Sequence, residues 1–126
     1  MSTQPVRSQV EAAHAAWDGA FNRADAKGVA ALYAPGSTFL PATHDVIEGP
    51  AGVESFFSGL FANGLSGHRL ELITLHEDAL TVVAAARWSA QGRNADGSAA
   101  SFGGIATHVF ERQADGSLKL KLHTFN

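Results

Sequence analysis

The sequence predicts a single domain of the α+β class, in which three helices pack on a curved mixed, mostly antiparallel sheet. Apolar residues recur at intervals of three and four before Gly64, as on one face of a helix, and they alternate from His68 to Asn126, as in strands. Helices followed by a long meander favour one sheet wrapped around the helices, with a pocket between the layers. Of the 126 residues, 45% are apolar, which is enough for one domain with its own core.

The first helix is predicted from Val6 to Ala24. Its apolar residues follow the spacing of a single helix face. They are Val6, Val10, Ala13, Trp17, Ala20, Phe21 and Ala24. The polar side chains between them are expected on a solvent-exposed face: Arg7, Glu11, His14 and Asp18.

Two shorter helices and two brief strands are predicted next. Asp25 is a preferred N-cap for a helix over Ala26–Ala34, which Pro35-Gly36 would end. Pro50 suits the first turn of a third helix, because an N–H at that position would be unpaired, and Asn63-Gly64 is a C-cap signal. The two brief strands are predicted at residues 37–40 and 46–48, with a loop at residues 42–45 between them.

Four longer strands are predicted in the second half of the chain, at residues 68–76, 80–92, 100–113 and 118–126. The alternation in the second of these places Trp88 on the same side as several alanines, and this more apolar side should face the helices. That inner set is Leu80, Val82, Ala84, Ala86, Trp88 and Ala90. The small alanines would leave space beside Trp88, as in a cavity wall.

The last strand alternates leucines with lysines, so its leucines are predicted to face inward, and the same parity carries Thr124 and Asn126 inward. A two-residue turn at Asp115-Gly116 would place His108 opposite His123 on the outer face, unless a bulge breaks the register. Apolar and aromatic residues gathered on an outer face suggest an interface with a second copy. The predicted dimer interface consists of Arg87, His108, Phe110, His123 and Phe125.

Composition excludes several functional classes. The chain contains no cysteine, which rules out disulfides, thiol catalysis and thiolate metal sites. Its net charge of -3 provides no basic surface for nucleic acid or for an acidic membrane. No apolar run approaches the length of about 18 residues needed to cross a bilayer, and the first residues lack the apolar core of a secretory signal. A cytoplasmic location is therefore expected.

Five segments support a resemblance to a known superfamily. They are Trp17-Asp18-Gly19-Ala20-Phe21-Asn22-Arg23-Ala24-Asp25, Ala31-Leu32-Tyr33-Ala34-Pro35, Val46-Ile47-Glu48-Gly49-Pro50, Gly104-Ile105-Ala106-Thr107-His108-Val109-Phe110 and His123-Thr124-Phe125-Asn126. Over nearly its whole length the chain resembles the nuclear transport factor 2-like superfamily, particularly its small SnoaL-like and ketosteroid-isomerase-like bacterial members. The resemblance implies a cone-shaped α+β barrel, open at one end and usually dimeric. Members include isomerases, dehydratases, cyclases, epoxide hydrolases and non-catalytic modules, so the fold alone assigns no function.

The resemblance does not extend to the catalytic residues of the steroid isomerases. Those enzymes use an aspartate base with a tyrosine and a protonated aspartate as hydrogen-bond donors. The tyrosine position matches Trp17, the base position falls on or beside Pro41, and the protonated-aspartate position matches Thr107. Indole and hydroxyl groups can donate, but neither replaces a base. Steroid isomerisation by that mechanism is therefore not expected.

Aromatic residues are the candidates for the pocket wall, although an ordinary core would also explain them. Tryptophan and tyrosine favour the pocket, because a buried N–H or O–H requires a partner. The predicted pocket residues are Trp17, Phe21, Tyr33, Phe39, Phe57, Trp88, Ile105, Thr107 and Asn126. Of these, Trp17, Tyr33 and Thr107 would orient a ligand by hydrogen bonds.

The candidate bases are histidines, which titrate near neutral pH. His44 and Asp45 lie in a loop near the expected cavity mouth, although adjacent loop residues commonly point into solvent. His108 and His123 would form an acid–base pair or, on the outer face, part of the interface. Arg87 would contact either a carboxylate or the second copy. No carboxylate or third histidine joins the predicted pair, so no metal site is expected, nor any cofactor.

These features predict a small-molecule-binding domain with an apolar pocket for an apolar or amphipathic ligand. If the domain is an enzyme, it would perform cofactor-free acid–base chemistry such as isomerisation, dehydration or cyclisation, with His44 or His108 as the base. The alternative is a non-catalytic binding or dimeric assembly module, which the lack of carboxylates on the predicted inner strand faces favours.

Overall fold

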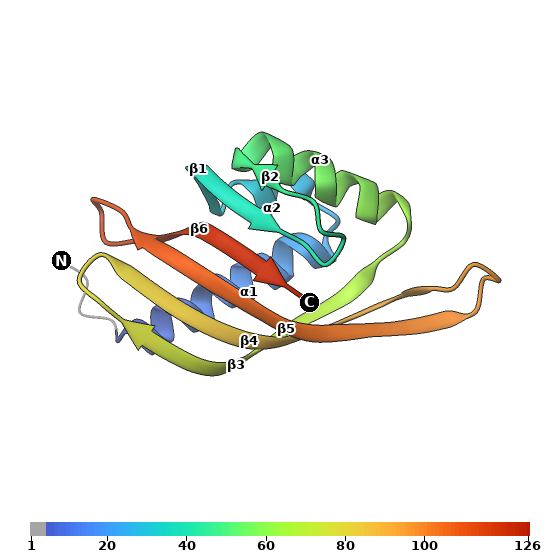
Figure 1. The fold of residues 1–126 in the computed structure, drawn as a ribbon. Coiled ribbons are helices and arrows are strands. Elements are labelled where there is room, and N and C mark those ends of the chain that lie inside the picture. Colours follow the sequence, from blue (N-terminus) through green and yellow to red (C-terminus); the bar gives the residue numbers. More distant parts are fainter. Residues whose placement is uncertain (1–4) are drawn as a thin grey trace.

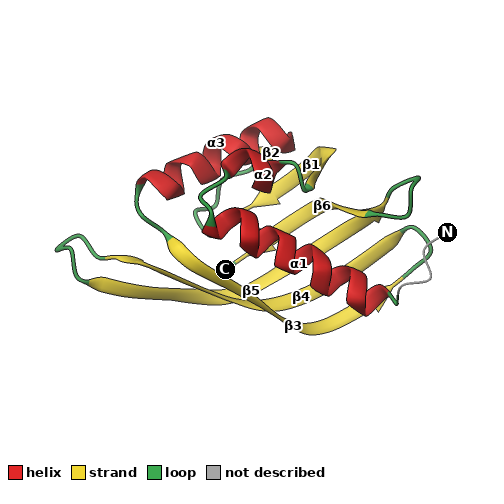
Figure 2. Cartoon of the chain, turned by 180° about the vertical axis from the view of Figure 1, so that it is seen from behind, coloured by secondary structure: helices red, strands yellow, loops and turns green. Residues whose placement is uncertain are grey.

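A computed structural model describes residues 5–126 of the chain, and its helices lie on one side of a curved sheet (Figures 1 and 2). The elements in chain order are α1 (Val6–Asn22), α2 (Ala26–Ala30), β1 (Tyr33–Leu40), β2 (Ile47–Glu48), α3 (Gly49–Ala62), β3 (Ser66–Glu77), β4 (Thr81–Arg93), β5 (Ala99–Arg112) and β6 (Leu118–Phe125). Helix α1 crosses over the sheet, while α2 and α3 lie together beside β1. The predicted α+β class is confirmed.

The sheet is mixed and open. Its strand order is β2-β1-β6-β5-β4-β3, and every pairing is antiparallel except the one between β1 and β6. Within residues 5–126 no pairing joins the edge strands β2 and β3, so the sheet curves around the helices without closing into a complete barrel. No helix of the described part of the chain is long and apolar enough to span a bilayer.

Helix α2 begins where the sequence predicts and ends earlier. The Asp25 side chain accepts a hydrogen bond from the Gly28 N–H at 2.9 Å, which confirms the predicted N-cap. The helix stops at Ala30 instead of Ala34, because the following residues join the sheet. Leu120 N–H donates to the Leu32 carbonyl at 2.9 Å, and Tyr33 pairs with Leu120. Pairing with β6 therefore overrides the local helical pattern.

Strand β4 presents the face that its alternation predicts. Val82, Ala84 and Ala86 are fully buried beneath the helices, whereas Arg87 is exposed on the opposite, outer face. Trp88 lies on the inner side with the alanines and contacts the ring of Phe125. The predicted concave wall of alanines and Trp88 is confirmed.

A bulge in β6 overturns the predicted orientation of the neighbouring histidines. His108 pairs with His123 as predicted, but Val109 pairs with Leu122 while Phe110 pairs with Leu120. Lys121 is thus an extra residue, and an extra residue inverts the inward and outward alternation beyond it. His123 and Phe125, which follow the bulge on β6, therefore face the helices together with Leu120. On β5, which has no bulge, Phe110 pairs with Leu120 because the turn before β6 has three residues instead of two, so His108 and Phe110 face the same side.

The predicted position on the outer face is consequently wrong for four of the five residues assigned to the dimer interface. His108, Phe110 and His123 are at most 4% exposed within one chain, and Phe125 packs on Phe39. Only Arg87 lies on the outer face. The same inversion moves two predicted pocket residues to the outer face, because Ile105 pairs with Arg87, and Thr107 pairs with Ala85.

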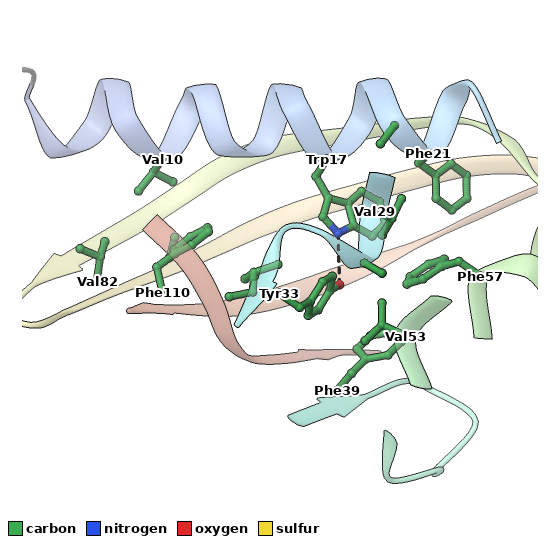
Figure 3. Packing of buried hydrophobic residues seen from close by; sticks show 14 residues of the cluster. Val10, Trp17, Phe21, Val29, Tyr33, Phe39, Val53, Phe57, Val82 and Phe110 are labelled. Carbon is green, nitrogen blue, oxygen red and sulfur yellow. Dashed lines mark hydrogen bonds between the residues drawn. The ribbon is translucent and has the colours of Figure 1, made fainter. Parts of the chain in front are cut away.

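The core is centred on aromatic and β-branched side chains from both layers (Figure 3). Val10 of α1, Val29 of α2, Phe39 of β1 and Val53 of α3 are all completely buried. Phe39 stacks on the ring of Phe57, with 5.5 Å between the ring centroids. This packing fixes α1 and α3 over the sheet and so sets the width of the space between them.

Candidate functional site

A cavity of about 330 Å³ lies between α1, α3 and the concave face of the sheet. Its lining is mostly aromatic and aliphatic, and consists of Trp17, Phe21, Ala42, Thr43, Phe56, Phe57, Leu60, Leu65, His68, Leu70, Trp88, Phe102, Ala106, His108, His123 and Phe125. Thr43 and three histidines are the polar members of this set, and no lysine, arginine, aspartate or glutamate belongs to it. The cavity therefore suits an uncharged, largely apolar molecule.

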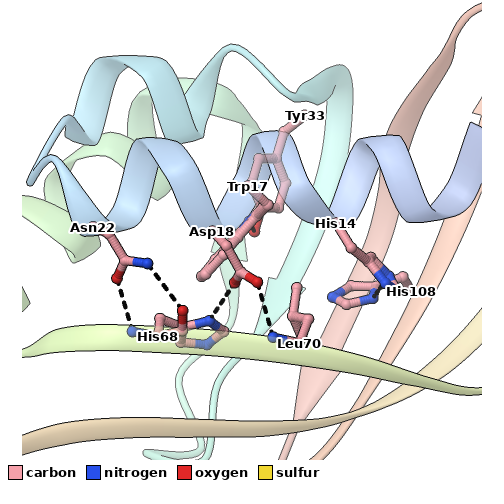
Figure 4. Close-up of polar contacts among 8 residues, drawn as sticks. All are labelled: His14, Trp17, Asp18, Asn22, Tyr33, His68, Leu70 and His108. Atoms are coloured by element: carbon pink, nitrogen blue, oxygen red, sulfur yellow. Dashed lines mark hydrogen bonds and ion pairs between the residues drawn. The ribbon is translucent and has the colours of Figure 1, made fainter.

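His68 and Asp18 form a hydrogen-bonded pair at the cavity wall (Figure 4). The His68 Nδ1 atom lies 2.7 Å from one carboxylate oxygen of Asp18, and the other oxygen accepts the Leu70 N–H at 2.9 Å. The side chains are 8% and 20% exposed, respectively. Asp18 is therefore anchored to β3 as well as to the imidazole.

Asn22 fixes the backbone of the same histidine. Its side-chain oxygen accepts the His68 N–H at 2.7 Å, and its amide nitrogen donates to the His68 carbonyl at 3.0 Å. Asp18 and Asn22 are four residues apart on α1, so one face of the helix holds both the backbone and the ring of His68. The ring is also packed between Trp17 and Trp88.

The contact with Asp18 determines which nitrogen of His68 is protonated. A carboxylate only accepts hydrogen bonds, so Nδ1 carries the proton, and Nε2 of the neutral ring carries the lone pair. No hydrogen bond within residues 5–126 uses Nε2 of His68, and this nitrogen is not fully enclosed. A lone pair on a cavity-lining imidazole, oriented by a carboxylate, is the arrangement of a general base.

His123 is held through a different relay. Trp17 Nε1–H donates to the hydroxyl oxygen of Tyr33 at 3.1 Å, as Figure 3 shows, and the Tyr33 hydroxyl lies 2.7 Å from His123 Nδ1. All three residues are at most 4% exposed. Burial raises the pKa of Tyr33 far above its ordinary value, despite the opposing hydrogen bond from Trp17, so the tyrosine remains a hydroxyl donor.

A pair of imidazoles connects α1 to β5. His14 Nε2 lies 3.1 Å from His108 Nδ1, and the rings of His108 and His123 are 4.5 Å apart at their centroids. Burial lowers the pKa of His108 well below 6.5, and charge on His123, His14 or His68 lowers it further. Burial also lowers the pKa of His14, against the raising effect of the Asp18 and Glu11 carboxylates.

Burial also lowers the pKa of His123, from 6.5 to about 3, with smaller contributions from charge on His68 and His14. An imidazole that is removed from water and surrounded by other imidazoles loses the hydration that stabilises its cation. At neutral pH the inner face of β5 and β6 therefore presents uncharged histidines to the cavity.

Several predicted site residues lie elsewhere. Trp17, Phe21, Phe57 and Trp88 line the cavity, whereas Tyr33 and Phe39 lie behind its wall among the buried core. Ile105 and Thr107 are on the outer face, as described above. Asn126 is exposed, and its carbonyl oxygen accepts the Trp88 Nε1–H at 3.1 Å.

The loop candidates do not reach the cavity. His44 and Asp45 are exposed, and the Asp45 carboxylate accepts the Thr43 hydroxyl at 2.6 Å. His44 has a φ of 70°, a conformation that belongs to a tight turn. Ala42 and Thr43 line the cavity instead, so this loop contributes a wall and not a base.

His14, Asp18 and His68 are not among the site residues predicted from the sequence, although the pattern carries a signal for two of them. His14 follows Val10 by four residues and precedes Trp17 by three, which places it on the buried stripe of α1, where it is 5% exposed. His68 precedes Leu70 by two residues and therefore shares the inner face of β3. The expectation that His14 and Asp18 face solvent is wrong. Within residues 5–126 no group of three or more acidic or histidine side chains is arranged to hold a metal ion.

The model of the SnoaL-like domain family matches residues 13–120. The chain belongs to this family. That result confirms the predicted membership of the nuclear transport factor 2-like superfamily. No curated protein matches the sequence.

Solved structures support the fold of this SnoaL-like domain. A ketosteroid isomerase-like protein from Erwinia carotovora has a TM-score of 0.82 at 19% identity, over 94% of this chain and 92% of that one. A putative calcium/calmodulin dependent protein kinase II association domain from Xanthomonas campestris has a TM-score of 0.81 at 22% identity, over 97% and 86%. The protein Aln2 from a Streptomyces species has a TM-score of 0.82 at 18% identity, over 100% and 93%. At these identities the likeness concerns the fold alone.

Proposed function

We propose that this SnoaL-like domain binds a small, uncharged, largely apolar molecule in its cavity and acts on it by cofactor-free acid–base catalysis. The reaction is a proton transfer of the kind that isomerisation, dehydration or cyclisation requires. The observation that supports this proposal is the His68–Asp18 pair, in which a carboxylate holds the imidazole so that an unshared nitrogen remains at the cavity. The predicted function stays the same, but the base is His68 and not His44 or His108.

The general base can be tested without knowing the natural substrate. We expect the wild-type protein to accelerate deuterium exchange at the carbons next to the carbonyl of 2-tetralone, a neutral bicyclic ketone, in D2O. His68→Gln removes the base and should lower the catalysed rate about 100-fold, the lower end of the range for general bases. The exchange is followed by proton NMR at neutral pH.

The control is His76→Gln, because His76 is an exposed histidine of the same strand β3 and should leave the rate unchanged. Exchange that is as fast with His68→Gln as with the wild type would show that His68 is not the base. Binding of the ketone without any catalysed exchange would favour the alternative, a non-catalytic binding module.

A second copy of this chain is the partner we propose for the outer face of the sheet. This face carries a row of apolar side chains from β4, β5 and β6, and an apolar surface of this kind is self-complementary across a two-fold axis. The row consists of Val83, Ala85, Ile105, Val109 and Leu122. It replaces the histidines and phenylalanines that the sequence assigned to the interface.

The dimer proposal predicts that a charge in the middle of this row dissociates the two copies. Val109 pairs with both Val83 and Leu122, so Val109→Asp should weaken the dimer more than tenfold in sedimentation velocity experiments. Ser101→Asp on the exposed arm of β5 is the control and should leave the dimer intact. A Val109→Asp protein that remains dimeric would place the interface elsewhere.

A further inference from the structure

We propose that His123 is a second catalytic residue, a neutral imidazole whose Nε2–H donates a hydrogen bond to the carbonyl oxygen of an uncharged ketone or aldehyde. The inference rests on the proposed function, because it names the substrate class and an additional role in the same cavity. Tyr33 and Trp17 act behind His123 as positioning residues. Their hydroxyl and indole N–H groups hold His123 and need not contact the ligand.

The direction of the relay fixes the proton on His123. The indole N–H of Trp17 can only donate, so it occupies an acceptor site on the Tyr33 hydroxyl and leaves the O–H free to donate. Within residues 5–126, His123 Nδ1, 2.7 Å away, is the only acceptor available to the Tyr33 O–H, so we assign the hydroxyl as the donor to Nδ1. Because Nδ1 of the neutral ring is the acceptor, Nε2 carries the hydrogen.

The remaining N–H of His123 has only the cavity to bind. Residues 5–126 provide no hydrogen-bond partner for Nε2 of His123, and this nitrogen is not among the fully enclosed polar atoms. The residue lines the cavity, is 4% exposed, and packs against Phe39 and Trp17. A fixed N–H donor in an apolar, largely dry site is suited to a developing negative charge on oxygen.

His68 and His123 therefore present opposite properties to one cavity. His68 offers the lone pair of Nε2, and His123 offers the N–H of Nε2, with the Trp17 ring beside both. In the proposed step, His68 removes a proton from the carbon next to the carbonyl, the C–H electron pair forms a C=C bond, and the C=O π pair moves to oxygen. The oxygen accepts the hydrogen bond from His123, and His68 later returns its proton to carbon.

The cavity also restricts the charge of the substrate. Its lining contains no lysine or arginine to balance a carboxylate or phosphate, and no carboxylate to balance a cation. The burial that lowers the pKa of His123 to about 3 keeps it uncharged at neutral pH and so removes it as a counter-ion as well. A neutral carbonyl compound suits both imidazoles. Its oxygen accepts a hydrogen bond from His123, and the carbon next to the carbonyl gives up a proton to His68.

The proton position on His123 can be measured in the ligand-free protein. Two-bond ¹H–¹⁵N spectra at neutral pH distinguish the two neutral tautomers, and we expect His123 protonated on Nε2 and His68 on Nδ1. Tyr33→Phe removes the donor to Nδ1 and should change the ¹⁵N shifts of His123 while leaving those of His68 in place. A wild-type His123 protonated on Nδ1 would overturn the proposal, and this result does not depend on any measurement of catalysis.

The carbonyl contact is tested with bound 2-tetralone by infrared spectroscopy. Its C=O stretch should move to lower frequency on binding, and His123→Phe should abolish this shift while His76→Gln, on the exposed side of β3, preserves it. Removing this hydrogen bond should also weaken the preference for 2-tetralone over tetralin, which lacks the carbonyl, by about tenfold.

The outcomes separate the two proposals. A bound ketone without a C=O shift, or a shift that survives His123→Phe, would overturn this inference and leave the binding function standing. A ketone that does not bind would overturn the proposed function and the inference together.

Discussion

The free energy of unfolding of this protein should fall steeply as the pH drops below 6.5. His123, His108 and His14 all have pKa values that burial lowers from 6.5, and that of His123 is lowered to about 3. Below pH 6.5 these imidazoles bind protons in the unfolded chain while they remain neutral in the folded one. Because the unfolded state then binds more protons, stability is complete above pH 6.5 and is lost as the pH falls towards the folded-state pKa values.

The magnitude follows from proton linkage. A histidine that protonates only when unfolded lowers the free energy of unfolding by up to about 1.4 kcal/mol per pH unit. His123 alone should therefore account for roughly 2 kcal/mol between pH 6.5 and pH 4.5, and burial of His108 lowers the stability further over the same interval. The Asp18 and Glu11 carboxylates reduce the contribution of His14. Urea denaturation at a series of pH values measures the slope.

Two variants make this prediction specific. His76→Gln removes an exposed histidine and should leave the pH profile unchanged. The double variant Tyr33→Phe with His123→Leu removes the buried imidazole and its hydroxyl partner, so it should flatten the acid branch. The indole N–H of Trp17 loses its acceptor in this variant, which lowers stability by a similar amount at every pH. A wild-type protein whose stability is constant from pH 7 to pH 4.5 would mean that these histidines are not buried as neutral groups.

Most of the fold was predictable because periodicity and turn residues were consistent over long segments. Asp25 and Pro50 mark helix starts through local hydrogen-bond geometry, and the alternation around Trp88 correctly assigns the inner face of β4. The end of α2 was not predictable in the same way, because residues 31–34 are helical by pattern, and the last of them enter β1 only through pairing with β6.

The orientation of the histidines could not be derived by alternation alone. The bulge at Lys121 has no proline or glycine to mark it, and it reverses which side His123 faces. Similarly, Asp18 has the composition of a solvent-exposed helix residue and acquires its role only when β3 brings His68 and the Leu70 N–H against it. A site assembled from α1, β3, β5 and β6 depends on tertiary register, which single-sequence patterns leave open.

The cavity can be filled by a single substitution in its wall. Ala106 of β5 is 2% exposed, lines the cavity and pairs with Ala86, so the larger side chain of Ala106→Leu would enter the space that the proposed ligand occupies. We expect this variant to lose more than 90% of the affinity for 2-tetralone with little change in thermal stability, because unfilled volume is available for the added atoms. Ala99→Leu, on the exposed end of the same strand, is the matched control.

Trp17 and Trp88 are the only two tryptophans of the chain, and both line the cavity, so intrinsic fluorescence reports directly on its occupancy. Titration with 2-tetralone should quench this emission saturably in the wild type and in Ala99→Leu, and should fail to do so in Ala106→Leu. Equal quenching of all three proteins, or no saturable quenching of the wild type, would contradict the claim that the helices and the concave sheet enclose a binding site for a small neutral molecule.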